Sequence, residues 1–273
     1  MIAAAFYPLQ WVTQRVACDL ADVTSITKPG AEPHDLELTP RDVAAVLDAA
    51  LIVYVHGFQP AVDDAVTQQD DRSKVLDVTR AAQLDLTYSP QDEGSRRSTA
   101  VTDPHFWLDP TRLATVAGEV ARGLARVDPA HAPRYAENAA AVTADLDRVD
   151  HEYSTGLATC RSRDLVTSHQ AFGYLSRRYG LTQIGIAAMT PDAEPSASAL
   201  SSVTEFVKRH AVGTIYFETL TSPAISRTIA AETGARTAQL DPIEGLTDRS
   251  RGHDYLDVMR SNLATLRAGQ GCR

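Results

Sequence analysis

The sequence predicts an α/β protein of two lobes, each built on a parallel β-sheet flanked by helices, joined by one long rigid helix. Short apolar stretches alternate with segments of helical periodicity, as in parallel sheets with crossover helices. A helix of roughly 28 residues, or about 40 Å at 1.5 Å per residue, is predicted at 130–157. The alternation of strands and helices restarts after it, and 273 residues suit two lobes of ordinary domain size.

The first half of the chain contains four predicted strands, separated by helical segments. The stretch 51–55 is almost continuously apolar, which is typical of a strand buried on both faces of a parallel sheet. Residues 89–103 hold Pro, Gly, Ser, Arg and Asp without an apolar period, which indicates an exposed loop. The strands are expected at 3–7, 23–26, 51–55 and 75–78, and the helices at 8–20, from Thr39-Pro40 onward, and at 110–127.

The long helix is predicted to act as a strut between the lobes, the alternative being a helix packed on one lobe only. We therefore divide the chain into an N-terminal lobe at 1–129, a linking helix at 130–158 and a C-terminal lobe at 159–273. Two sheets joined in this way leave a cleft between them, a preferred place for ligands. In the second lobe, strands are expected at 164–167, 183–187, 214–217 and 237–240, and helices at 170–179, 198–210, 223–233 and 255–266.

Composition and charge exclude several classes of protein. The chain is 44% hydrophobic and 22% charged, as in ordinary soluble globular proteins. Its net charge of −9 and its lack of a Lys/Arg run argue against nucleic-acid binding. No stretch approaches the roughly 20 apolar residues of a membrane span. Because residues 1–7 read as a strand and not as a signal peptide, an exported protein would have lost its targeting segment.

The three cysteines, Cys18, Cys160 and Cys272, form no CxxC pair, so a thiolate zinc site is not expected. In an oxidising compartment Cys160 and Cys272 could join the C-terminal tail to the second lobe. The alternative is three free thiols, and the sequence does not decide between them.

Three of the eight histidines occupy equivalent positions in the predicted topology. His34 follows a short strand, His105 lies between a loop and a helix, and His169 lies where a strand passes into a helix. Such loops gather at the carboxyl edge of a parallel sheet, where ligands bind. His56 also ends a strand and is a weaker candidate, whereas the remaining histidines are expected on the surface.

Asp241 follows the last predicted strand and is the natural fourth member of this group, although an Asp before Pro also often caps a turn. Three imidazoles and one carboxylate suit a borderline ion such as Zn²⁺. Glu32 and Glu244 are nearby carboxylates that could support the ligands by hydrogen bonds. The sequence therefore predicts one zinc ion per chain, bound by His34, His105, His169 and Asp241.

Five motifs resemble the zinc- and manganese-specific solute-binding proteins of ABC transporters, the ZnuA/TroA-like family. They run in the family's order across nearly the whole chain and are specific only in combination. The motifs are Phe6-Tyr7-Pro8-Leu9, Pro29-Gly30-Ala31-Glu32-Pro33-His34-Asp35-Leu36-Glu37, Asp103-Pro104-His105-Phe106-Trp107-Leu108-Asp109-Pro110, Ser168-His169-Gln170-Ala171-Phe172-Gly173-Tyr174-Leu175 and Leu240-Asp241-Pro242.

The resemblance implies a monomeric, non-enzymatic binding protein outside the cytoplasm that docks on the permease of a zinc importer. It further implies residence in a periplasm or attachment to the cell surface through a lipidated cysteine that this sequence lacks. His169 stands where manganese-preferring members tend to carry a carboxylate, which favours zinc over manganese. Two departures are the absence of histidine from residues 89–103 and the presence of His56 where relatives commonly have a small polar residue.

Three other functions remain open at this stage. The chain could be a manganese-binding subunit of the same kind of importer. It could be a zinc hydrolase that uses the three histidines, with Asp241 as general base, although no HExxH motif is present. It could also be a surface adhesion or scaffold protein with a structural metal. A zinc-donating protein is a further possible partner for the binding function.

Overall fold

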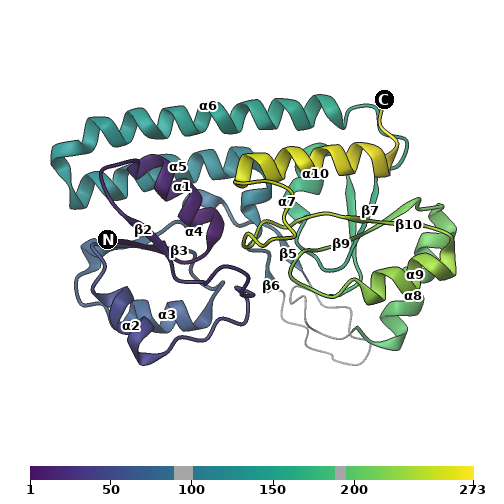
Figure 1. Ribbon diagram of the computed structural model, residues 1–273, viewed down its shortest axis with the longest axis horizontal. Helices are drawn as coiled ribbons and strands as arrows, with labels where there is room; N and C mark the ends of the chain where they lie inside the picture. Colours follow the sequence, from purple (N-terminus) through teal and green to yellow (C-terminus); the bar gives the residue numbers. More distant parts are fainter. Residues whose placement is uncertain (89–100, 188–194) are drawn as a thin grey trace.

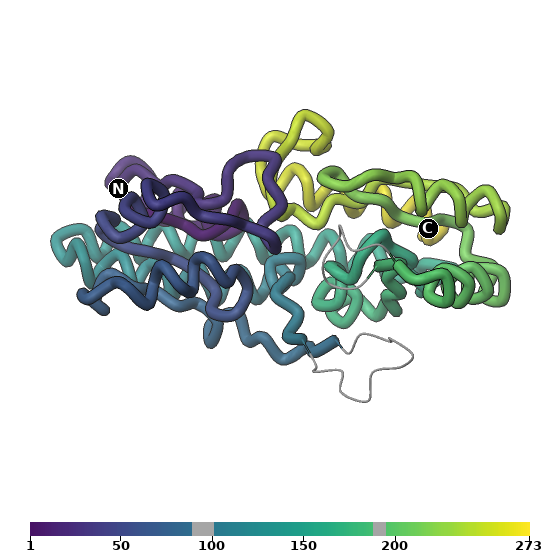
Figure 2. Tube along the Cα trace, turned by 90° about the horizontal axis from the view of Figure 1, so that it is seen from below, coloured from purple at the N-terminus to yellow at the C-terminus, as the bar shows by residue number. Residues whose placement is uncertain are grey.

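The computed structural model describes residues 1–88, 101–187 and 195–273 and confirms the predicted two-lobed α/β fold. The N-terminal lobe and the C-terminal lobe lie side by side, and one long helix, α6 (Ala132–Gly156), runs along both of them (Figure 1). Seen along a perpendicular direction, the two lobes again occupy opposite ends of an elongated molecule (Figure 2).

The N-terminal lobe is built on a parallel sheet of four short strands in the order β2-β1-β3-β4. All four residues of β3 are buried, as its apolar sequence predicts. Thr39 begins α2 with a capping box, in which its hydroxyl accepts from the backbone N–H of Asp42. The elements are β1 (Ile2–Ala4), α1 (Tyr7–Ala17), β2 (Val23–Ser25), α2 (Pro40–Leu47), β3 (Leu51–Tyr54), α3 (Pro60–Thr67), η1 (Arg72–Lys74), β4 (Val75–Asp77), α4 (Thr79–Ala82), β5 (Thr87–Tyr88), β6 (Val101–Thr102), η2 (Phe106–Leu108) and α5 (Pro110–Val127).

The C-terminal lobe repeats this plan with a second parallel sheet, in the order β10-β9-β7-β8. In both sheets the strand order places the loops that follow the strands at one carboxyl edge, where the sequence places the candidate ligands. After η3 (Pro129–His131) and α6, the elements are β7 (Asp164–Thr167), α7 (Gly173–Tyr179), β8 (Thr182–Gly185), α8 (Ala197–His210), β9 (Thr214–Phe217), α9 (Ala224–Thr233), β10 (Arg236–Gln239) and α10 (Tyr255–Gln270).

Most predicted elements lie within a few residues of their expected bounds. The short helices α3 and α4 were not predicted. The helix expected at 170–179 begins only at Gly173, because residues 168–172 form the loop that carries His169. The predicted loop at 89–103 lies largely outside the described residues, and the antiparallel pair β5–β6 flanks it. None of the helices in the described ranges is both long and apolar enough to cross a membrane.

One hydrophobic core runs through both lobes and along α6. It includes Val53 and Phe6 of the first lobe, Leu146 of α6, and Leu175 and Tyr255 of the second. The Tyr153 hydroxyl of α6 donates to the Met259 carbonyl of α10 across 2.7 Å. The helix predicted as a strut thus packs on both lobes. A smaller separate core, which includes Val203 and Ile229, lies under α8 and α9 at the far side of the second sheet.

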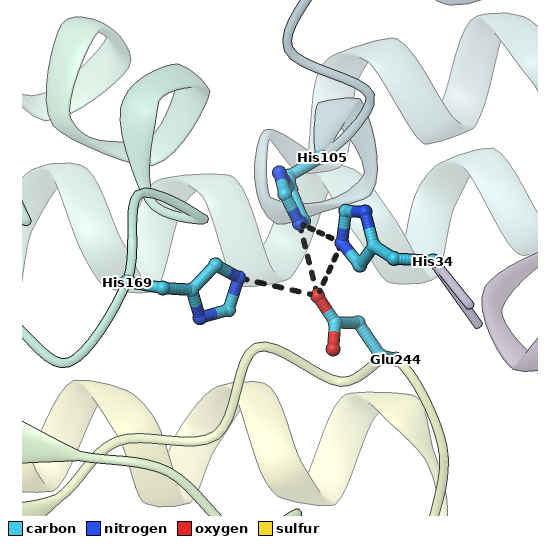
Figure 3. A group of neighbouring side chains, drawn as sticks. All are labelled: His34, His105, His169 and Glu244. Atoms are coloured by element: carbon cyan, nitrogen blue, oxygen red, sulfur yellow. Dashed lines mark hydrogen bonds and ion pairs between the residues drawn. The ribbon is translucent and has the colours of Figure 1, made fainter. Parts of the chain in front are cut away.

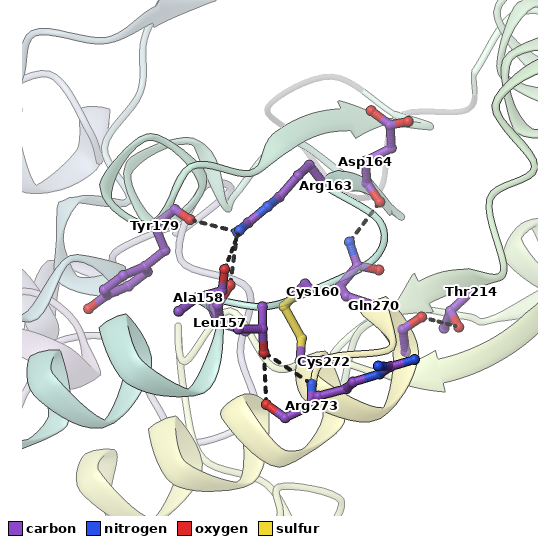
Figure 4. The surroundings of a disulfide bond; sticks show 12 residues. Leu157, Ala158, Cys160, Arg163, Asp164, Tyr179, Thr214, Gln270, Cys272 and Arg273 are labelled. Carbon is purple, nitrogen blue, oxygen red and sulfur yellow. Dashed lines mark hydrogen bonds between the residues drawn. A yellow bond between two sulfur atoms is a disulfide. The ribbon is translucent and has the colours of Figure 1, made fainter.

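Cys160 and Cys272 form a disulfide bond that attaches the end of α10 to the segment after α6 (Figure 4). Cys18 is a free, exposed thiol. The polar surroundings add to this attachment, because the side chain of Gln270 donates to the Asp164 carbonyl across 2.8 Å. The disulfide therefore closes a large loop that contains the whole C-terminal lobe.

We predict that replacing both disulfide cysteines by serine lowers the free energy of unfolding by about 2–4 kcal/mol, because the bond restricts a long loop of the unfolded chain. The two cysteines are 112 residues apart in sequence. Urea unfolding of the double variant measures the loss, and Cys18→Ser is the matched control, expected to match the parent chain. A double variant as stable as the parent would contradict the prediction.

Candidate metal centre

Three histidine rings and one glutamate converge where the two lobes meet (Figure 3). His34 comes from the loop after β2, His105 precedes η2, and His169 follows β7. Glu244 comes from the loop after β10. One ligand atom from each residue lies within 4.8 Å of all the others. The sequence-predicted histidines are thus brought together, two from the first lobe and one from the second.

Four of the distances among these ligand atoms, including 3.2 Å between the Nε2 atoms of His34 and His105, are close to those around a small tetrahedral ion. Glu244 Oε1 lies 2.9 Å from His105 Nε2, 3.4 Å from His34 Nε2 and 3.5 Å from His169 Nε2. Bonds of about 2.0–2.1 Å at the tetrahedral angle separate ligand atoms by about 3.3–3.4 Å. His169 Nε2 and Glu244 Oε2 are buried without a hydrogen-bond partner. A cation at the centre of the cluster would give His169 Nε2 the partner that it lacks.

Two carboxylates hold the rings of His105 and His169 from behind. Asp103 Oδ1 lies 2.8 Å from His105 Nδ1, and it also accepts from the backbone N–H of His105. Glu218 Oε1 lies 2.6 Å from His169 Nδ1 and accepts from the backbone N–H of His169. An Nδ1–H bonded to a carboxylate leaves the Nε2 lone pair for a metal and fixes the ring's orientation.

The charges of this cluster shift the pKa values of its members in opposite directions. Burial lowers the pKa of His105, but hydrogen bonds to Asp103 and Glu244 outweigh it and the net pKa is raised. Burial also opposes protonation of His169, yet Glu218 raises the pKa of His169 well above its ordinary value. Burial raises the pKa of Glu244, but the three nearby histidine rings, His105 foremost, bring the net pKa well below the usual range.

The other histidine of the cluster from the first lobe, His34, has a different environment. Burial lowers the pKa of His34. Its backbone N–H donates to Glu32 Oε1 across 3.0 Å, so Glu32 supports the loop that carries this ring. Burial and the neighbouring Glu244 raise the pKa of Glu32 to about 8. His34 also packs edge-on against Phe58, with 4.8 Å between ring centroids.

Asp241, named as the fourth ligand by the sequence analysis, lies outside this cluster. Its Oδ1 accepts from the backbone N–H of Ile243 at 2.8 Å, and its Oδ2 accepts from the Ser250 hydroxyl at 2.8 Å. Burial raises the pKa of Asp241 to about 6. Ile243 has a left-handed backbone conformation, and it is Glu244, to which the sequence analysis gave only a supporting role, that faces the three histidines.

His56 does not reach the cluster. Its exposed ring pairs with Asp63, with Nδ1 2.9 Å from the carboxylate. Among the histidines expected on the surface, the exposed rings of His131 and His210 pair with partly exposed acidic groups. The sequence analysis missed Asp103 and Glu218. The position of Glu218 could have identified it, because it follows the predicted strand 214–217 as His169 follows the predicted strand 164–167.

A two-lobed α/β fold with a buried cluster of three histidines and one glutamate between its lobes defines a binding protein for a transition-metal ion. The chain belongs to the family described as "Zinc-uptake complex component A periplasmic", whose model matches residues 2–269. This family comprises the metal-binding components of zinc transporters and not enzymes.

Similar proteins with zinc in their names cover almost the whole chain. Zinc-binding protein AdcA of Streptococcus pyogenes is 33% identical over 97% of this chain, which spans only 55% of the length of AdcA. The high-affinity zinc uptake system protein ZnuA of Bacillus subtilis is 32% identical over 97% of this chain and 86% of its own length. The Zn(II)-bound ZnuA-like domain of AdcA from Streptococcus pneumoniae superposes with a TM-score of 0.81, at 34% identity and 98% coverage of both chains.

We predict that Glu218→Ala and Asp103→Ala each weaken zinc binding by about 10–100-fold, because each frees the ring of a metal-facing histidine. Competition titration against a chromophoric chelator measures the change. The matched control is Asp63→Ala, which removes the carboxylate behind the exposed His56 ring and is expected to leave zinc affinity unchanged. Equal losses in all three variants would contradict the prediction.

Proposed function

We propose that the chain captures Zn²⁺ outside the cytoplasm and delivers it to an ABC-type importer, with His34, His105, His169 and Glu244 as the ligands. The observation that carries this proposal is the convergence of four ligand atoms, which all lie within 4.8 Å of one another and of which four pairs lie 2.9–3.5 Å apart. The zinc-related names of the similar proteins support it. In this proposal Asp241 is not a ligand, which departs from the ligand set expected from the sequence.

Zinc binding accounts for the site better than hydrolysis does. The hydrolase alternative requires Asp241 as a general base, but both of its carboxylate oxygens accept hydrogen bonds from within the protein. A fourth protein ligand also fills the position that a catalytic zinc keeps for water. Three imidazoles favour zinc over manganese, which prefers oxygen ligands.

The proposed transport cycle uses two lobes that move little against each other. We place the N-terminal lobe at 1–129, the linking helix at 130–158 and the C-terminal lobe at 159–273. The continuous core through both lobes and α6 supports a small tilt on metal binding, in preference to a wide opening. The partner would be the importer's permease, and the chain would act as a monomer in a periplasm or on a cell surface.

We predict that the metal-depleted chain binds one Zn²⁺ tightly and Mn²⁺ weakly in calorimetric titrations. His169→Ala and Glu244→Ala each remove a buried ligand, so each should lower zinc affinity by at least about 100-fold, a loss of about 2.7 kcal/mol. His56→Ala is the matched control and should bind as the parent chain does. Manganese binding as tight as zinc binding would refute the choice of metal, and no binding of either ion would refute the proposed function.

We predict that zinc affinity falls as the pH is lowered from 8 to 5, because protons compete with zinc for the imidazoles. The pKa values of His105 and His169 are raised in the metal-free protein, so these rings hold protons at a higher pH than ordinary histidines. Zinc binding should therefore release protons near neutral pH, and more of them as the pH falls toward the ordinary histidine value. Calorimetry in buffers of different ionisation enthalpy counts the protons, and a count of zero at pH 7 would contradict the prediction.

A further inference from the structure

Glu244 follows a turn whose backbone is strained. Ile243 has φ of +60°, a left-handed conformation that a β-branched side chain rarely adopts. Its side chain is fully buried, so surrounding residues pack against it. Strained backbone of this kind persists only where surrounding contacts fix it, and it is concentrated at functional sites.

Asp241 and Asn262 supply the first set of these contacts. Asp241 Oδ1 accepts from the backbone N–H of Ile243 across 2.8 Å and so closes the turn. Asn262, on α10, pairs with both backbone groups of Asp241: its Oδ1 accepts from the N–H at 3.0 Å, and its Nδ2 donates to the carbonyl at 2.7 Å. Asp241 and Asn262 are both almost completely buried.

Trp107 supplies the second set, from the other lobe. Its indole N–H donates to the Pro242 carbonyl across 2.8 Å, in a buried hydrogen bond. Its ring lies 5.2 Å from the His105 ring, measured between centroids. The Tyr255 hydroxyl, at the start of α10, donates in turn to the Trp107 carbonyl. The turn that precedes Glu244 is thereby tied to the segment that carries His105.

We propose that Asp241, Asn262 and Trp107 are positioning residues that hold the strained turn at residues 241–243 and so fix Glu244 among the three histidines. This inference rests on the proposed zinc function and assigns Asp241 a role through Glu244, not on the metal. The Glu244 carboxylate is completely buried, and it can reach the cluster only if the backbone before it keeps this conformation.

Four variants of two residues test the proposal by zinc titration: Asp241→Asn, Asp241→Ala, Glu244→Ala and the double variant of Asp241→Ala with Glu244→Ala. An asparagine keeps an oxygen that accepts from the Ile243 N–H, so Asp241→Asn should bind zinc within about threefold of the parent chain. Asp241→Ala removes that acceptor and should weaken binding by about 10–100-fold. In the Glu244→Ala background, Asp241→Ala should add less than about threefold, because a residue that acts through Glu244 has nothing left to position.

Cobalt(II) gives a second readout, since its visible absorption is sensitive to the number and geometry of its ligands. The spectrum of Asp241→Ala should shift toward that of Glu244→Ala, and the spectrum of Asp241→Asn should stay with the parent. Asn262→Ala should behave as Asp241→Ala does, although it touches no ligand. Asn138→Ala is its matched control, because Asn138 also donates to a backbone carbonyl, that of Val16, but far from the turn in sequence. Urea unfolding of each variant ensures that affinities are compared between folded chains.

Two results would overturn the inference while the parent chain still binds zinc one to one. If Asp241→Asn loses as much affinity as Asp241→Ala, and the losses add in the Glu244→Ala background, Asp241 is itself a ligand. If Asp241→Ala binds zinc as the parent does, the turn needs no such support. A parent chain that does not bind zinc would overturn the proposed function together with this inference, so the two failures are distinguishable.

Discussion

The site depends on one constraint: a single fully buried carboxylate, that of Glu244, must lie against three imidazole rings from two lobes. A buried charge without partners is strongly unfavourable, so the carboxylate and the rings stabilise one another and none of them is placed independently. Asp103 and Glu218 extend this arrangement outward, since each holds a ring from behind. The geometry between the lobes is therefore set by electrostatic pairing as much as by packing.

The rest of the fold meets this constraint by packing the two lobes against each other. One hydrophobic core runs from the first sheet through α6 into the second lobe. Close backbone approach adds to this, because a Cβ on Gly173, at the start of α7, would lie only 2.5 Å from Asp103 Oδ2. The helix that follows His169 thus packs directly on the carboxylate that orients His105. A ligand set drawn from two lobes is precise only when such contacts fix the lobes relative to each other.

The sequence predicts the fold well because periodicity and strand–helix alternation are local signals, and strands such as 164–167 and 214–217 lie where they were expected. The three histidines were found because their positions at strand ends follow from topology alone. The fourth member of the cluster was not found. Asp241 and Glu244 both follow the last strand, and the turn between them decides which carboxylate faces the histidines. The positive φ of Ile243 places Glu244, and not Asp241, beside the histidines. The sequence gives no sign of this left-handed turn, because a β-branched residue rarely adopts it. Asp103 was passed over for a similar reason: its contact with His105, two residues away, is read only from side-chain directions.

The pairing within the cluster also explains why zinc, in the proposed function, would be cargo and not a structural ion. His105 Nε2 lies 2.9 Å from Glu244 Oε1, and Asp103 and Glu218 lie against the Nδ1 atoms of His105 and His169. Asp103, Glu218 and Glu244 each pair with an imidazole of the cluster, while the hydrophobic core that joins the lobes is built from other residues. A structural zinc, by contrast, supplies folding free energy that the rest of the chain lacks. In the proposed function, protons and zinc would compete for the same nitrogen lone pairs in a scaffold that the core and the disulfide maintain, and a site of this kind could release its ion without losing its fold.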